Sequence, residues 1–132
     1  MINKLKRLLG RPEGLEGAIV PESSHVSFGL IYNNLPVGTL EVKDGKWLFK
    51  YTELFKRQDN VLPLIDFPDL GKVYESEELW PFFISRIPST NRSAVKEVLS
   101  KEHIDEKDLT ALLIRFGKRT ITNPFLLEPD TV

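Results

Sequence analysis

The dipeptide Asp44-Gly45 constrains the fold of this chain more than any other short feature. It lies between two runs that are typical of β-strands, residues 38–43 and 46–51. A two-residue hairpin loop of type I′ requires positive φ at both of its residues, and Asp-Gly tolerates that geometry well. The dipeptide therefore predicts an antiparallel hairpin in which Lys43 faces Lys46.

This register divides the hairpin side chains between two faces. It pairs Val42 with Trp47, Leu40 with Phe49, and Gly38 with Tyr51. One face then carries Leu40, Val42, Trp47, Phe49 and Tyr51, and the other carries Thr39, Glu41, Lys43, Lys46, Leu48 and Lys50. An apolar face opposite a largely charged one predicts an antiparallel sheet that packs on a core through one side.

The residues before and after the hairpin predict further strands and loops. Apolar residues alternate from Val26 to Tyr32, which indicates a strand, and Asn33-Asn34 favours a reversal because Asn tolerates positive φ. Residues 51–60 predict one short helical turn. Residues 61–74 predict a packed loop, in which we expect burial of Val61, Leu62, Leu64, Ile65, Phe67 and Leu70.

Three helices are predicted in the second half of the chain. The first is capped by Ser76 or Glu77, has Pro81 in its first turn and ends at Pro88. Its mainly apolar stripe contains Leu79, Phe82, Phe83, Arg86 and Ile87, whereas Trp80 and Ile84 lie beside that stripe. The second helix covers residues 92–102, with Ala94, Val95, Val98 and Leu99 facing inward.

The third helix has the clearest boundary signals. Asp105 is expected to cap it, Asp108 to occupy the third helical position, and Gly117 to follow its last turn. The tail after Gly117 predicts a strand whose pairing Pro124 limits to a sheet edge. Together these elements predict an α+β domain, with a small, curled, barrel-like antiparallel sheet and about three helices packed against it.

Composition fits one domain of ordinary size. The chain has 132 residues, no cysteine and a formal net charge of -1, so its total charge does not favour nucleic acid or anionic lipid. We expect a basic N-terminal segment and linker over residues 1–25, with order beginning near Val26, a domain over residues 26–128, and a tail over residues 129–132. No apolar run approaches the ~20 residues of a membrane span, and the lack of cysteine suits a cytoplasmic protein.

No assembled chemistry is recognisable in the sequence. The glycines form no phosphate-binding loop, and His25 and His103 are far apart and close to loop boundaries. The acidic run from Asp105 to Asp108 is explained by helix capping rather than by a metal. We therefore expect no catalytic residue, no cofactor and no metal. A small nucleic-acid-binding module remains an alternative, because Trp47, Phe49 and Tyr51 are flanked by Lys46 and Lys50, although the register places the aromatic and lysine side chains on opposite faces.

Three segments in order resemble the N-terminal subdomain of HipA-family toxin kinases. They are "VGTLEVKDGKWLFKYTELF", "VYESEELWPFFISRIPS" and "IDEKDLTALLIRFG", within a region of about residues 27–128. The matching positions are Gly38, Leu40, Phe49, Tyr51, Pro81, Phe82, Phe83, Pro88, Asp108, Leu112, Leu113 and Gly117. The chain departs from the family in having Pro88-Ser89-Thr90 where Pro-Glu-Gly is usual.

The resemblance implies a function through other proteins. The kinase residues of the family lie beyond the similar region, so the chain resembles the subdomain made separately, as in the HipS proteins of tripartite HipBST toxin–antitoxin systems. This implies a bacterial antitoxin that neutralises a HipA- or HipT-like serine/threonine kinase, with a HipB-like DNA-binding protein as a further partner. The alternative is a detached subunit that such a kinase requires for folding or activity.

Four residues are candidates for contact with that partner. Trp80 is the first, because tryptophan buries a large area at low entropic cost and lies off the apolar stripe here. Ile84 follows it one helical turn later. Ser89 and Thr90 follow the helix and are also potential phosphoacceptors, although a capping role explains them equally well.

Overall fold

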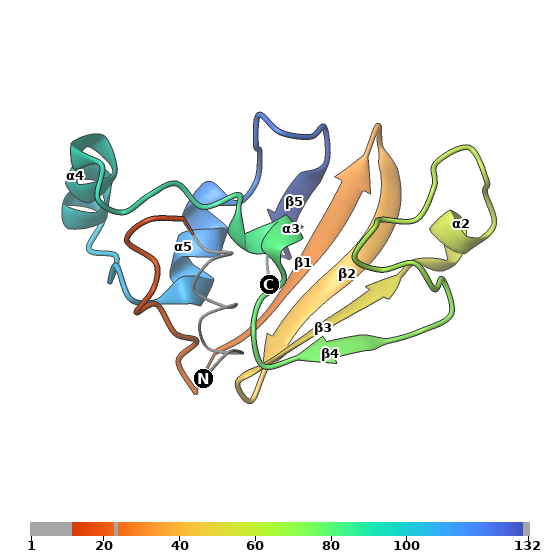
Figure 1. Ribbon diagram of the computed structural model, residues 1–132, viewed down its shortest axis with the longest axis horizontal. Coiled ribbons are helices and arrows are strands. Elements are labelled where there is room, and N and C mark those ends of the chain that lie inside the picture. Colours follow the sequence, from red (N-terminus) through yellow and green to blue (C-terminus); the bar gives the residue numbers. More distant parts are fainter. Residues whose placement is uncertain (1–11, 23, 131–132) are drawn as a thin grey trace.

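The computed structural model describes residues 12–22 and 24–130 as an antiparallel sheet with four helices (Figure 1). The strands are β1 (His25–Tyr32), β2 (Leu35–Lys43), β3 (Lys46–Tyr51), β4 (Tyr74–Ser76) and β5 (Leu126–Pro129), and the helices are α2 (Glu53–Lys56), α3 (Pro81–Ile84), α4 (Ser93–Lys101) and α5 (Leu109–Phe116). The strand order is β4-β3-β2-β1-β5. The α+β class is thus confirmed. Among the described residues β4 and β5 are the edges, so the sheet is curled but not closed into a barrel.

Both predicted turns of the sheet are present. Asp44 and Gly45 have φ angles of 53° and 77°, and Asn33 and Asn34 have φ angles of 48° and 65°. A two-residue hairpin loop of type I′ requires such positive φ values at both of its residues. The β2–β3 register is the predicted one, from Lys43 opposite Lys46 to Gly38 opposite Tyr51.

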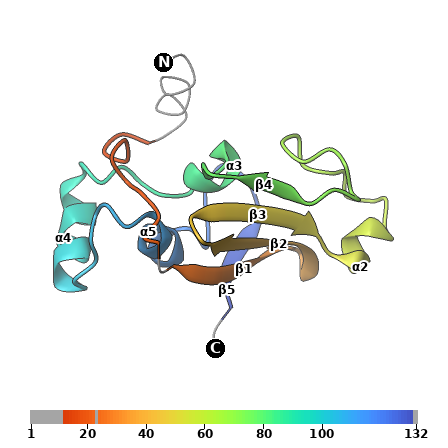
Figure 2. The same cartoon turned by 90° about the horizontal axis from the view of Figure 1, so that it is seen from below.

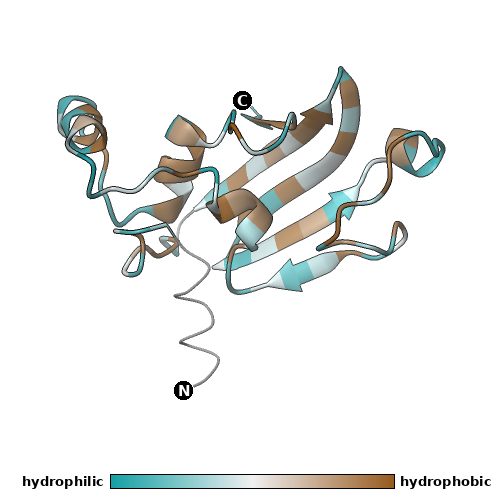
Figure 3. Ribbon diagram, turned by 45° about the horizontal axis from the view of Figure 1, so that its top comes forward, coloured by the Kyte–Doolittle hydropathy of each residue, from teal (hydrophilic) through white to brown (hydrophobic). Residues whose placement is uncertain are grey.

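The core lies on one face of the sheet. The strand residues fully buried there are Phe28, Leu30, Val37, Leu40, Val42, Trp47 and Phe49. Apolar and polar bands alternate along the strands in Figure 3, as the period of two demands. Figure 2 shows α3 over one side of the sheet, α4 and α5 beyond one end, and α2 at the other end.

The first predicted helix is much shorter in the structure. Ser76 pairs opposite Trp47 as the last residue of β4, a strand that the sequence analysis missed, and is therefore unavailable as a helix cap. Trp80 is the N-cap of α3, and Pro81 takes the first helical position, where it loses no intrahelical hydrogen bond. The helix ends after one turn at Ile84.

The predicted ends of the later helices also need correction. Asp108, rather than Asp105, caps α5, because its side chain accepts a hydrogen bond from the Ala111 amide at 3.1 Å. Gly117 follows α5 but has a right-handed φ of -82°. Its lack of a side chain matters for packing, since a Cβ there would lie 2.5 Å from the Leu113 carbonyl oxygen. In α4, Val95 and Leu99 are buried as predicted, whereas Ala94 is exposed.

The loop between α2 and β4 buries fewer of its apolar side chains than predicted. Phe67 is fully buried, but Leu62 and Ile65 are 79% and 96% exposed. The Phe67 ring lies against the sheet, where it stacks on Phe49 with ring centroids 4.3 Å apart. The predicted tail strand is an edge strand, as expected, although it begins only at Leu126.

Order begins well before Val26, where the sequence analysis placed it. Residues 12–22, here called the N-terminal strap, bury Leu15 completely and Ala18 almost completely in the core. The Ile19 amide donates to the Lys107 carbonyl oxygen, and the Leu109 amide donates to the Ile19 carbonyl oxygen, both at 2.9 Å. The strap therefore ties the start of α5 to the domain. The basic residues 1–11 and the last two residues lie outside the described part.

Candidate interaction surface

Trp80 occupies the start of α3 at the surface of the core. Its backbone is extended (φ -65°, ψ 150°), which is the conformation that a residue before proline prefers. This geometry turns the chain into the helix at Pro81 and leaves the indole half-buried. Trp80 is thus placed where the sequence analysis expected it, beside the buried residues of the helix.

Two core rings support the indole of Trp80. It lies edge-on to Phe67, with ring centroids 5.0 Å apart and an interplanar angle of 84°. It also contacts Phe83 at 6.4 Å and 61°. Phe67 and Phe83 are both fully buried, and each packs on Phe49 of the sheet. Edge-to-face contacts of this kind fix the orientation of a ring. The exposed part of Trp80 is therefore presented in a defined position.

Tyr51 holds the loop that carries Phe67. Its hydroxyl donates to the Phe67 carbonyl oxygen at 2.6 Å and accepts from the Leu64 amide at 2.9 Å. Burial raises the pKa of Tyr51 to about 12, partly opposed by the hydrogen bond from the Leu64 amide. The phenol is therefore neutral at physiological pH, and only a neutral phenol can make both of these hydrogen bonds.

The other three candidate residues contribute little exposed area. Ile84 is almost completely buried, because α3 ends after one turn and packs both Phe83 and Ile84 into the core. Thr90 is also buried. Ser89 is partly exposed, and its hydroxyl oxygen accepts from the Asn91 amide at 3.2 Å. Of the four candidates, only Trp80 and Ser89 have side chains that a partner can reach in this conformation.

Arg86 is a structural residue whose importance the sequence analysis missed. Its guanidinium is buried and donates to three carbonyl oxygens, those of Gly117 (2.5 Å), Lys118 (2.9 Å) and Phe125 (2.5 Å), and to Asn123 Oδ1 (3.3 Å). Burial lowers its pKa to about 10, so it stays charged at neutral pH. The sequence feature that could have indicated this role is the position of a charged residue within an otherwise apolar helical stripe.

The described residues show no arrangement suited to metal or nucleic-acid chemistry. They contain no group of three or more His, Asp or Glu side chains that could hold a metal ion. Trp47, Phe49 and Tyr51 all face the core, so they form no platform on which bases could stack. No helix among the described residues has the length and apolar character needed to cross a membrane.

Comparison with known proteins identifies the family. The family model described as the HipA N-terminal domain matches residues 29–122. The chain belongs to the HipA N-terminal domain family. The match begins after the N-terminal strap and includes Trp80, its supporting rings and Arg86. A search of the curated proteins gives no match. The HipA N-terminal domain is not the kinase catalytic domain.

Proposed function

We propose that this chain is an antitoxin-like protein without catalytic activity, which binds and neutralises a HipA- or HipT-like serine/threonine kinase. The observation that carries the proposal is the HipA N-terminal domain match over residues 29–122. Because this domain is distinct from the kinase catalytic domain, the catalytic residues in this proposal come from a separate partner. A HipB-like DNA-binding protein is a further partner in such a system.

Trp80 is the residue that we propose as the anchor. It is half-buried and fixed against Phe67 and Phe83, so binding would cost little side-chain entropy. Tryptophan is also the residue type most enriched among interface anchors. In the proposed mechanism, the domain docks beside the nucleotide lobe of the kinase, and Trp80 helps to obstruct the active site or to hold it open.

Co-expression with a HipA- or HipT-like kinase tests the proposal, and a kinase gene found next to the gene of this chain would supply the first one to use. We expect the kinase alone to arrest growth and the kinase together with this chain to permit it. Toxicity that needs both proteins would instead identify a detached subunit required by the kinase. Growth arrest that this chain does not change would contradict both functions.

A Trp80→Ala variant tests the anchor separately. We expect the affinity for the kinase to fall by about tenfold or more, as for an interface anchor. Thermal unfolding of the variant must be measured in parallel, because the indole also packs on Phe67. A folded Trp80→Ala protein with unchanged affinity would remove Trp80 from the interface.

A further inference from the structure

The loop between α2 and β4, residues 57–73, displays large apolar side chains to solvent. Leu62 and Ile65 are 79% and 96% exposed, and Leu54 in the preceding helix is 55% exposed. Single exposed apolar residues are ordinary, whereas apolar side chains gathered on one surface are typical of interaction sites. Their exposure has a structural cause if hydrogen bonds hold the neighbouring backbone in place.

Hydrogen bonds fix the loop near each exposed residue. The Gln58 side chain donates to the carbonyl oxygens of Phe55 and Val61 and accepts from the Val61 amide, at 3.2, 3.0 and 2.9 Å. This holds the residue before Leu62. Tyr51 holds the residue before Ile65 through the Leu64 amide, at 2.9 Å. The exposed positions are therefore built into the fold.

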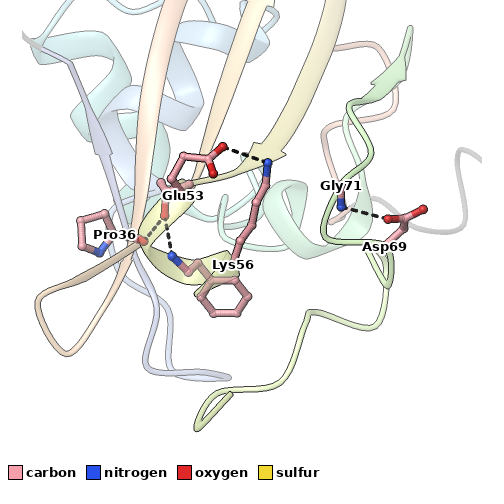
Figure 4. Close-up of polar contacts among 7 residues, drawn as sticks. Pro36, Glu53, Lys56, Asp69 and Gly71 are labelled. Atoms are coloured by element: carbon pink, nitrogen blue, oxygen red, sulfur yellow. Dashed lines mark hydrogen bonds and ion pairs between the residues drawn. The ribbon is translucent and has the colours of Figure 1, made fainter. Parts of the chain in front are cut away.

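Both ends of the loop are fixed as well (Figure 4). Ahead of the loop, the preceding helix α2 is anchored: Thr52 donates to the Pro36 carbonyl oxygen at 2.5 Å and caps α2, and Glu53 pairs with Lys56 at 3.2 Å. Near its end, the Gly71 amide donates to Asp69 Oδ1 at 2.9 Å. A loop held in this way loses little conformational entropy when a partner covers it.

The loop and the proposed anchor share one support. The Phe67 ring, which lies under the loop, contacts Trp80 at 5.0 Å and Tyr74 of β4 at 4.9 Å. Ile65 lies two residues before Phe67 in the chain. A partner that covers Trp80 therefore approaches the same end of the core that the loop covers.

We infer that the 57–73 loop is a second contact region for the kinase, with Leu62 and Ile65 inserting into an apolar surface next to the one that receives Trp80. This inference rests on the proposed function. The exposed charged side chains of the loop are three carboxylates, Asp59, Asp66 and Asp69, and two cations, Arg57 and Lys72. Asp66 directly follows Ile65, so we expect the kinase surface opposite to be apolar, with a basic side chain beside the position that receives Ile65.

The test is a binding titration with the same kinase as in the co-expression experiment, purified as a phosphotransfer-deficient variant. The variant is Leu62→Ser with Ile65→Ser, and the matched control is Ile121→Ser, which removes a fully exposed isoleucine from the loop between α5 and β5. We expect the double variant to raise Kd by about tenfold or more, and the control to change it by less than about twofold. Both should unfold at the wild-type temperature, since neither alters a buried side chain.

Asp66 supplies a second, electrostatic arm of the test. Asp66→Asn should weaken binding by a few-fold at low salt, and this difference should shrink at high salt, because exposed charges are screened.

The outcomes separate the two proposals. A wild-type chain that does not bind the kinase overturns the proposed function and this inference with it. A wild-type chain that binds, with a double variant that binds equally well, overturns the inference alone. An equal loss in the Ile121→Ser control would also overturn it, because a general effect of exposed apolar area would then explain the result. Dimerisation of the free wild-type chain that the double variant abolishes would assign the loop to a second copy instead.

Discussion

The hydroxyl of Thr90 donates a hydrogen bond to the backbone oxygen of Gly14, 3.0 Å away. This contact joins the N-terminal strap to the segment between α3 and α4. Gly14 has a φ of 90°, in the region that favours glycine, and a Cβ on it would clash with the Thr90 hydroxyl. Thr90 is therefore part of the attachment of the strap, and its buried side chain is not available for other contacts.

Gly14→Ala should destabilise the protein by about 1–3 kcal/mol, because alanine at positive φ is strained and its methyl group displaces Thr90. Urea unfolding followed by fluorescence measures the change. The strap should also exchange its amide hydrogens faster in the variant, most clearly at Ile19, whose amide donates to Lys107.

Gly29→Ala is the matched control. Gly29 lies in β1 with no strained φ, and a Cβ there would meet nothing within 4 Å. Alanine is favoured over glycine within a strand by about 0.5–1 kcal/mol. We expect Gly29→Ala to be neutral or slightly stabilising. Equal destabilisation by the two substitutions would show that the Gly14 geometry is not what matters.

Arg86→Met should cost about 3 kcal/mol or more of unfolding free energy. The substitution keeps an apolar stem but leaves the carbonyl oxygens of Gly117, Lys118 and Phe125 without their charged donor. Chemical unfolding measures the loss, and amide exchange should locate it in the segment between α5 and β5.

Arg115→Met provides the comparison for Arg86. Arg115 binds Glu102 through two hydrogen bonds of 2.8 and 3.0 Å, but this pair lies at the surface. Exposed ion pairs contribute about 0–1 kcal/mol. A loss for Arg86→Met no larger than that for Arg115→Met would contradict the structural role of Arg86.

The hairpin was predictable from sequence because its determinants are local. The Asp44-Gly45 turn sets the register, and alternation then assigns Trp47 and Phe49 to the core face. The start of α3 was not predictable in the same way. Ser76 is a good helix cap by residue type, but pairing of residues 74–76 with β3 takes it into the sheet. A long-range contact overrides a local preference there.

For the candidate surface too, local sequence patterns predicted some residues correctly and failed for others. Trp80 was found because it lies off the apolar stripe of residues 79–87, and it is half-buried as that position suggests. Ile84 was assigned to the same surface by assuming a continuous helix, and that assumption fails because α3 ends at Ile84. Leu62, Ile65 and Phe67 are similarly apolar in sequence. Only the folded structure shows that Phe67 is the one that packs on Phe49, while Leu62 and Ile65 stay exposed.

Tyr51→Phe should destabilise the protein by about 1–3 kcal/mol at neutral pH, because the Phe67 carbonyl oxygen and the Leu64 amide lose a partner. Urea unfolding measures the change. Exchange of the Leu64 amide should accelerate at the same time, since that amide has the phenol oxygen as its acceptor.

The pH dependence of Tyr51→Phe separates the hydroxyl from simple packing. A tyrosine in the unfolded chain ionises near pH 10, whereas the pKa of Tyr51 in the folded protein is about 12. Between these values the unfolded state has released a proton that the folded state still holds, so rising pH favours unfolding. The contribution of Tyr51 is complete below pH 10 and is lost as the pH rises through 12. Wild type should therefore lose stability more steeply than Tyr51→Phe over this range, and parallel profiles would contradict the assignment.

Thr110→Val should stabilise the protein by about 1 kcal/mol. The Thr110 hydroxyl is buried in α5 and has no hydrogen-bond partner among the residues that the structure describes, so it carries a desolvation cost without compensation. Valine has nearly the same shape and a similar helix propensity, and it removes that cost. Thermal and urea unfolding measure the gain.

Thr122→Val is the control, because Thr122 is exposed and its hydroxyl lies 3.1 Å from that of Thr120. This substitution should change the unfolding free energy by less than about 0.5 kcal/mol. A loss of stability in Thr110→Val would show that its hydroxyl is satisfied in solution, by a bound water molecule or by a rotation towards the preceding turn of the helix.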